Sequence, residues 1–226
     1  MKGFTLALSL AAAAVAAPFD AAAVVEKRQL SSTSNELSLG SCRPIVFIFA
    51  RGSTEIGNMG STVGPATCSA LKRIYGSTDV ACQGVGGAYD ATVGGNLLPQ
   101  GTTSGAIREA QSLFQLASSK CPDSIVVAGG YSQGAAVMTA AITGLSTTVK
   151  NQVAGAVLYG DTRNFETGGA IPSYPTANTL ILCAIGDGVC GAGLTVTPAH
   201  LSYIDDVPEA AAFLQSRIVA AGGPSS

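Results

Sequence analysis

The chain has 226 residues, of which 47% are hydrophobic and only 12% are charged, and its formal net charge is −2. This length and composition predict one globular domain with a substantial core and argue against a disordered chain. Because the chain has no basic block, nucleic-acid binding through neutralised phosphates is not expected.

The N-terminus has the pattern of a secretory leader. A basic start precedes an apolar run at residues 4–17, which is too short and too rich in alanine for a membrane span. Ala14-Val15-Ala16 fits the A-x-A cleavage rule, so we expect residues 1–16 to be a signal peptide. Residues 17–28 end in a dibasic pair and are interpreted as a propeptide. The remaining residues, 29–226, are expected to form a single secreted, extracellular domain.

The chain contains six cysteines, and an even number in an oxidising compartment predicts three disulfides. Short separations favour the pairs Cys183–Cys190 and Cys68–Cys82, which leaves Cys42–Cys121 as the long connection. A zinc site is a poor alternative, since the sequence has no C-x-x-C pair and a single histidine. We expect neither a metal nor another cofactor.

The predicted elements alternate between buried strands and helices, which indicates a parallel sheet covered on both faces. No internal repeat or interdomain linker is visible. In chain order we predict a loose polar arm at 29–40, a strand at 44–50, a helix at 63–75, a strand at 80–85 and an irregular surface loop at 89–103. A helix at 104–119 capped by Ser104, a strand at 125–128 and a helix from 135 follow. The last predicted elements are strands at 153–159 and 179–185 and a helix at 208–219 capped by Asp205 and Asp206.

The strand at 125–128 leads directly into Gly130-Tyr131-Ser132-Gln133-Gly134 and then into a helix. Strand, G-x-S-x-G and helix form the context of a nucleophile elbow. Gly130 and Gly134 lack the β-carbons that would collide in so sharp a turn, and the helix start directs N–H groups toward Ser132. This context favours a nucleophilic serine over a glycine-rich turn that merely contains one.

A nucleophilic serine needs a base, and His200 is the only histidine. Asp187, at the exit of a predicted strand, is the expected orienting acid. The order Ser132, Asp187, His200 is that of α/β hydrolases. Asp161, at another strand exit, is the rival acid, and a turn aspartate remains the structural alternative for Asp187.

An oxyanion hole requires two donors near the nucleophile. The Gln133 N–H, at the start of the helix, is one candidate. Ser53, just after the strand at 44–50, is the other, although a simple Gly-Ser turn explains it equally well.

Five motifs occur in a characteristic order: Phe49-Ala-Arg-Gly-Ser-Thr-Glu55, Gln83-Gly-Val-Gly-Gly-Ala-Tyr89, Gly130-Tyr-Ser-Gln-Gly-Ala135, Asp187-Gly-Val-Cys190 and Pro198-Ala-His-Leu201. Together they resemble the motifs of fungal cutinases, over about residues 42–219. The resemblance implies a secreted serine esterase that cleaves the plant polyester cutin. It also implies a small α/β hydrolase: a three-layer α/β/α sandwich with a central, mostly parallel five-stranded sheet and no lid.

By position, the resemblance makes Ser132 the nucleophile, His200 the base and Asp187 its partner. It places the oxyanion hole at Ser53 and Gln133. It implies that Asn96 supports Ser53 and that the lips of the substrate crevice are Val93, Leu97, Leu98, Leu194 and Val196. It also implies the disulfides Cys42–Cys121 and Cys183–Cys190, and some members of the family have a disulfide that matches Cys68–Cys82.

The sequence departs from the family pattern at two positions. Asp161 stands where an uncharged residue is expected, and Gly95 where some relatives carry an acid. Both changes alter the charge near the crevice, and neither touches the triad.

The expected partners are insoluble polyester and small acyl esters, bound by a monomer without membrane or nucleic-acid partners. An acetylxylan esterase is the alternative enzyme, but apolar lips argue against so small and polar a substrate. A secreted surface-binding protein that keeps a hydrolase fold is the non-enzymatic alternative, and the intact set of Ser, His and Asp argues against it.

Overall fold

The computed structural model describes residues 30–191 and 193–225. The signal peptide and propeptide expected within residues 1–28 lie outside the described residues. Among the described residues, no helix combines the length and apolarity that a membrane crossing requires.

The chain folds around one sheet of five strands in the order β2-β1-β3-β4-β5. All neighbouring strands are parallel, so the predicted mostly parallel sheet is confirmed. Because parallel strands share one carboxyl edge, the segments that follow them meet at one end of the molecule. The strands are β1 (Ile45–Ala50), β2 (Val80–Gly84), β3 (Ile125–Tyr131), β4 (Val153–Tyr159) and β5 (Thr179–Leu182).

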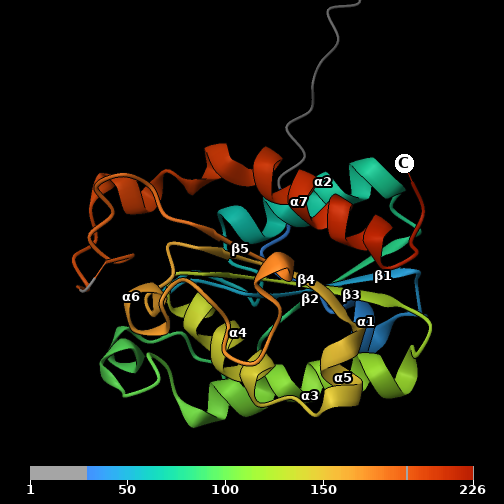
Figure 1. The fold of residues 1–226 in the computed structure, drawn as a ribbon, viewed down its shortest axis with the longest axis horizontal. Helices are drawn as coiled ribbons and strands as arrows, with labels where there is room; N and C mark the ends of the chain where they lie inside the picture. Colours follow the sequence, from blue (N-terminus) through green and yellow to red (C-terminus); the bar gives the residue numbers. More distant parts are fainter. Residues whose placement is uncertain (1–29, 192, 226) are drawn as a thin grey trace, which may run out of the picture.

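Helices cover both faces of the sheet and make three layers (Figure 1). One face carries α3 (Ser104–Lys120), α4 (Gln133–Thr143) and α5 (Thr147–Gln152). The other carries α2 (Val63–Tyr75) and α7 (Val207–Ala220). The short elements are α1 (Glu36–Leu39), α6 (Asn164–Thr167) and the 3₁₀ helices η1 (Val93–Leu97), η2 (Thr176–Asn178), η3 (Pro198–Leu201) and η4 (Tyr203–Asp206).

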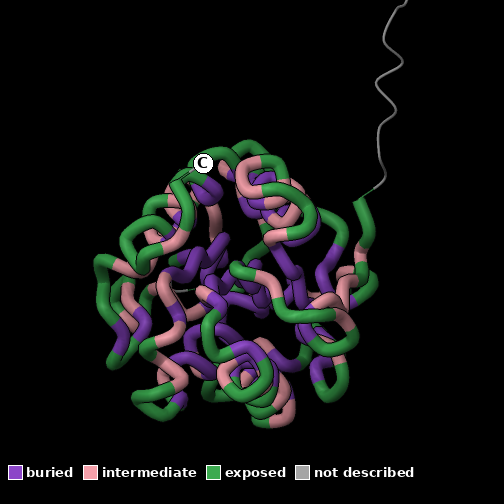
Figure 2. Tube along the Cα trace, turned by 90° about the vertical axis from the view of Figure 1, so that its right-hand side faces the viewer, coloured by how far each residue is buried: buried purple, intermediate pink, exposed green. Residues whose placement is uncertain are grey.

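The central strands are apolar throughout because both of their faces are buried. In β1, Val46 and Ile48 belong to the core cluster that contains the apolar residues of α3 and α4, while Phe47 and Phe49 belong to the cluster on the α2 and α7 side. Figure 2 shows the buried segments gathered inside, with exposed segments around them. The sheet is therefore packed on both faces up to the carboxyl edge, where the loops begin.

Three disulfides join Cys42 to Cys121, Cys68 to Cys82 and Cys183 to Cys190. The last two are the pairs that short separations favoured, and the first is the long connection expected to remain. The Cys183–Cys190 bond closes the loop that follows β5.

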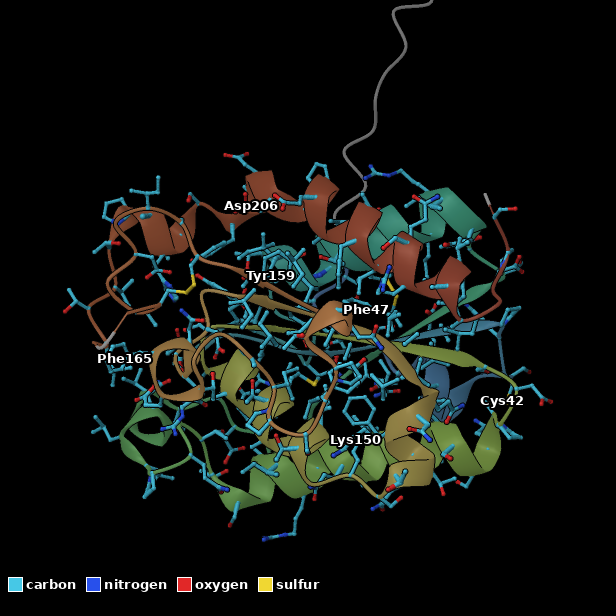
Figure 3. All side chains as sticks on the ribbon, in the orientation of Figure 1. Cys42, Phe47, Lys150, Tyr159, Phe165 and Asp206 are labelled. Carbon is cyan, nitrogen blue, oxygen red and sulfur yellow. A yellow bond between two sulfur atoms is a disulfide. The ribbon has the colours of Figure 1, made fainter. Side chains whose placement is uncertain are left out.

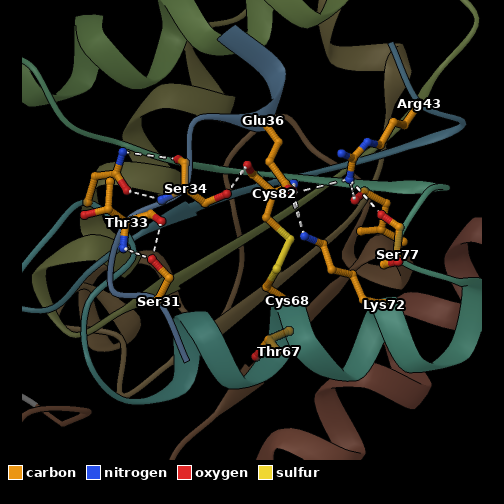
Figure 4. Close-up of a disulfide and its surroundings, with 12 residues drawn as sticks. Ser31, Thr33, Ser34, Glu36, Arg43, Thr67, Cys68, Lys72, Ser77 and Cys82 are labelled. Carbon is orange, nitrogen blue, oxygen red and sulfur yellow. Dashed lines mark hydrogen bonds and ion pairs between the residues drawn. A yellow bond between two sulfur atoms is a disulfide. The ribbon is translucent and has the colours of Figure 1, made fainter. Parts of the chain in front are cut away.

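The arm predicted to be loose is anchored instead. Glu36, in α1, accepts the Cys82 backbone N–H at 2.8 Å and forms an ion pair with Lys72 at 2.7 Å (Figure 4). Lys120 donates to the carbonyl of Leu37, whose side chain is buried. The local sequence is polar and signals a loop, whereas the partners that fix it lie far along the chain.

Two helix caps also differ from the predictions. Thr103, rather than Ser104, caps α3 by accepting from the Ala106 N–H at 3.1 Å. Asp206 precedes α7 but makes no side-chain cap, because its helical backbone (φ −90°, ψ −4°) continues from η4.

Candidate active site

Ser132 lies between the end of β3 and the start of α4, with φ 55° and ψ −121°. Such a backbone conformation costs about 1–3 kcal/mol and persists only where its surroundings enforce it. The flanking chain crosses so closely that a β-carbon at Gly130 would collide with the Gly134 carbonyl, and one at Gly134 with the Ala50 carbonyl. The two glycines therefore permit the sharp turn that presents Ser132 at the carboxyl edge.

His200, in η3, is buried, and its Nδ1 lies 2.8 Å from Asp187 Oδ2. The Asp187 side chain is fully buried and accepts two further hydrogen bonds: Tyr203 donates to Oδ2 at 2.5 Å, and the Val189 N–H donates to Oδ1 at 2.8 Å. Burial disfavours the carboxylate, but the bonds from Tyr203, His200 and Val189 outweigh it and hold the pKa of Asp187 below its usual range. An ionised Asp187 only accepts, so Nδ1 donates and Nε2 remains available as the basic nitrogen.

The imidazole is held from its other sides as well. The Tyr131 ring stacks on it with centroids 5.2 Å apart, and the Tyr131 hydroxyl donates to the His200 carbonyl at 2.8 Å. Burial, with the charges of Glu55 and Asp187, raises the pKa of Tyr131 to about 12, so this hydroxyl keeps its proton. A β-carbon at Gly160 would lie 2.7 Å from His200 Cε1, so this glycine leaves room for the ring.

The two oxyanion candidates are both fixed by neighbours. Asn96 Nδ2 donates to Ser53 Oγ at 3.0 Å, and it also donates to the Val93 carbonyl. Gln133 begins α4, where the first N–H groups of a helix have no intrahelical acceptor. Its side chain donates to the Thr92 carbonyl at 2.7 Å. Gly95 leaves room for this amide, because a β-carbon there would lie 2.9 Å from Gln133 Nε2.

Ser132, His200, Ser53 and Asn96 all line one cavity of about 360 Å³. Its walls are otherwise mainly apolar, and they include all but one of the predicted lip residues. Leu98 is not part of the lining and lies exposed beside it. The apolar residues of the lining are Val93, Leu97, Tyr131, Val189, Leu194, Val196 and Leu201.

Two further apolar side chains are exposed outside this cavity. Phe165, in α6, and Ile185, after β5, are both exposed. Hydrogen bonds tie their segments to the loops of the site: Asn164 donates to the Cys190 carbonyl at 3.0 Å, and Thr197 donates to the Gly186 carbonyl at 2.9 Å. Figure 3 places Phe165 at the end of the molecule opposite Cys42, which precedes β1, and hence at the carboxyl end of the sheet.

A larger cavity, of about 890 Å³, lies at the N-terminal arm. Glu36, Arg43 and Lys72 line it. None of the predicted catalytic or oxyanion residues does, so it is not a candidate for the same chemistry.

Asp161, the rival acid, points into the protein. It is fully buried, and its Oδ1 accepts the Arg163 N–H at 2.9 Å. Its Oδ2 is also buried and has no hydrogen-bond partner among the described residues. Burial raises the pKa of Asp161 to about 6, although Arg163 partly offsets the shift. In the described structure the residue bonded to His200 is Asp187.

Asp161→Asn is expected to change how stability depends on pH. Because the pKa rises on folding, from 3.8 to about 6, ionising the buried carboxylate costs the native state up to about 3 kcal/mol above pH 6 and nothing below pH 4. The free energy of unfolding of the parent chain should therefore fall between pH 4 and pH 7, and by less in Asp161→Asn. Urea denaturation at several pH values measures the difference.

The exposed Asp123→Asn provides the control, and it should keep the parent's pH dependence. Equal pH dependence in Asp161→Asn and the parent would contradict the assignment of this penalty to Asp161.

Comparisons with known proteins show the family and the fold of the chain. The family model described as Cutinase matches residues 41–218. A protein of Aspergillus terreus named Probable cutinase 5 is 51% identical over 94% of this chain and 96% of its own length. The solved structure of a Trichoderma reesei cutinase with a phosphonate inhibitor superposes with a TM-score of 0.74 at 30% identity, covering 84% of this chain and 81% of that one. The catalytic core of an acetyl xylan esterase from the same organism shares the fold at 19% identity, with a TM-score of 0.61 over 77% of this chain and 98% of its own.

Proposed function

The chain belongs to the cutinase family of serine esterases, and on this premise we propose that it hydrolyses cutin-like polyester and short-to-medium acyl esters with Ser132 as nucleophile. The observation that carries the proposal is one cavity that joins an elbow serine and a histidine bonded to a buried carboxylate, with mainly apolar walls. Apolar walls suit an acyl chain better than a sugar-borne acetate, which favours this substrate class over acetylated xylan.

In the proposed mechanism, Ser132 Oγ attacks the ester carbonyl carbon and transfers its proton to His200 Nε2. The negative charge of Asp187 stabilises the imidazolium that forms. The Gln133 N–H and Ser53, held by Asn96, stabilise the oxyanion. The C–O bond to the alcohol then breaks, and the alcohol leaves with the proton from His200. Water then attacks the acyl-enzyme and gives a proton to His200. The bond between the acyl carbon and Ser132 Oγ breaks, His200 returns the proton to Oγ, and the acid leaves.

Three disulfides favour an oxidising compartment, so we also propose that the enzyme acts outside the cell. All groups of the proposed site come from one chain, which supports action as a monomer.

The test compares p-nitrophenyl esters from acetate to palmitate, cutin and acetylated xylan, each with and without an organophosphate. We expect inhibitable turnover that peaks at short-to-medium chains, with fatty-acid release from cutin. Activity confined to acetate and acetylated xylan would make the protein an acetylxylan esterase. If the organophosphate does not label the protein and no ester is turned over, the protein would instead be a binding protein.

The exposed side chains of Phe165 and Ile185, here called the apolar rim, predict a difference between soluble and insoluble substrates. Phe165→Ser and Ile185→Ser remove exposed apolar contacts without touching the cavity lining. Together they should lower adsorption to a polyester film, and its hydrolysis, by about threefold to tenfold, while kcat/KM on p-nitrophenyl butyrate stays unchanged.

Leu39→Ser is the matched control for these variants, because Leu39 is exposed on α1, away from the carboxyl end of the sheet (Figure 1). It should leave adsorption unchanged. An equal loss in the control would show that adsorption does not depend on the rim.

A further inference from the structure

Tyr203 lies three residues after His200 and was not singled out in the sequence. Its side chain is 1% exposed. The hydroxyl bridges both ends of the turn that carries Asp187: it accepts the Ala184 N–H at 3.0 Å and donates to Asp187 Oδ2 at 2.5 Å. The oxygen that faces His200 Nδ1 therefore accepts two hydrogen bonds.

We propose that Tyr203 is a positioning residue of the triad, whose hydroxyl fixes the Asp187 carboxylate toward His200 and shares the negative charge of its Oδ2. The inference rests on the proposed esterase function and adds a residue that controls the acid partner of its base.

Packing fixes the Tyr203 ring independently of its hydroxyl. It meets His200, Tyr131 and Tyr159 edge to face, with centroids 6.0, 6.1 and 6.2 Å away. The charged groups that act on it are Asp187 and, from η4, Asp206. Burial and the bond to Asp187 raise the pKa of Tyr203 well above its usual value, so the hydroxyl remains a donor throughout the working range.

Removing only this hydroxyl should have two separable effects. Asp187 loses a bond that orients it, so the imidazole is less well aligned with Ser132 and kcat falls. Oδ2 also keeps more of its negative charge, so the His200–Asp187 pair holds a proton more strongly. The low-pH limb of kcat/KM, which reports protonation of this pair, should then move to higher pH.

The experiment measures pH profiles for a soluble p-nitrophenyl ester with Tyr203→Phe and with Tyr159→Phe. We expect kcat to fall about tenfold or more in Tyr203→Phe, as for other groups that orient a functional side chain. The midpoint of the low-pH limb of its kcat/KM profile should move to higher pH by about half a pH unit or more. Tyr159→Phe is the matched control: Tyr159 is a buried residue like Tyr203, and its hydroxyl is bonded to Thr67 at 2.8 Å, away from the triad. The low-pH limb of its kcat/KM profile should lie at the same pH as that of the parent, and its kcat should be nearly unchanged.

An unchanged limb in a folded Tyr203→Phe would overturn the proposal, as would the same shift in Tyr159→Phe. If Tyr203→Phe does not fold, 3-fluorotyrosine at position 203 provides the second test. This more acidic phenol is a stronger donor, so the limb should move to lower pH, and no shift would overturn the proposal. Failure of the parent chain to hydrolyse esters would instead contradict the proposed function.

Discussion

Ser132→Ala is expected to lower kcat/KM for p-nitrophenyl butyrate by about 10⁵-fold or more. Without the hydroxyl no acyl-enzyme forms, and the His200–Asp187 pair is left without a nucleophile to activate. The fold should be unaffected, since the strained backbone at Ser132 is enforced by the turn and its glycines and the Ser132 side chain makes no capping bond. Initial rates measure the loss of turnover, and the stoichiometry of organophosphate labelling measures the loss of the reactive hydroxyl.

Ser146→Ala is the control for this substitution. The Ser146 hydroxyl caps α5 by accepting the Val149 N–H, so its loss should lower the free energy of unfolding by about 1 kcal/mol and leave turnover intact. Turnover in Ser132→Ala above about 1% of the parent rate would place the nucleophile elsewhere.

The second large effect is expected from Asp187→Asn, which should reduce kcat by about 10³–10⁴-fold. A neutral amide does not balance the charge of the imidazolium. Its NH₂ group can also donate to Nδ1, which then must accept, so Nε2 carries the ring proton and cannot take one from Ser132. Rates measured between pH 6 and pH 10 separate this loss from a simple shift of the pH optimum.

Asp161→Asn tests the rival acid with the same chemical change. Asp161 bonds to the Arg163 N–H and not to His200, so its turnover should stay close to that of the parent. Should the two variants exchange these outcomes, Asp161 would be the working acid and the observed pairing of Asp187 would be incidental.

Local signals in the sequence were sufficient for the sheet and for the turn that carries Ser132. Buried strands show as continuous apolar runs, and β4 and α2 have the predicted bounds. The elbow is equally local, because strand, serine turn and helix follow one another directly. The prediction for Ser132 therefore needed no knowledge of distant residues.

Other features depend on partners that a local pattern does not reveal. The arm around α1 looked loose because Lys72, Lys120 and Cys82, which hold it, are distant in the sequence. Tyr203 is close to His200 in the chain, but its importance arises from the meeting of η4 with the loop after β5. A buried tyrosine hydroxyl needs a partner, and that need is the signal that could have singled it out.

The anchored arm has a consequence for self-association. β2 is an edge strand, and an edge offers unpaired N–H and C=O groups to strands of other molecules. Here the arm occupies that edge: Glu36 accepts the Cys82 N–H, Ser34 accepts the Gly84 N–H, and Asn35 forms an antiparallel bridge with Gln83. The arm therefore blocks this edge against pairing with strands of other molecules. Removing the arm would expose this edge to strands of other molecules.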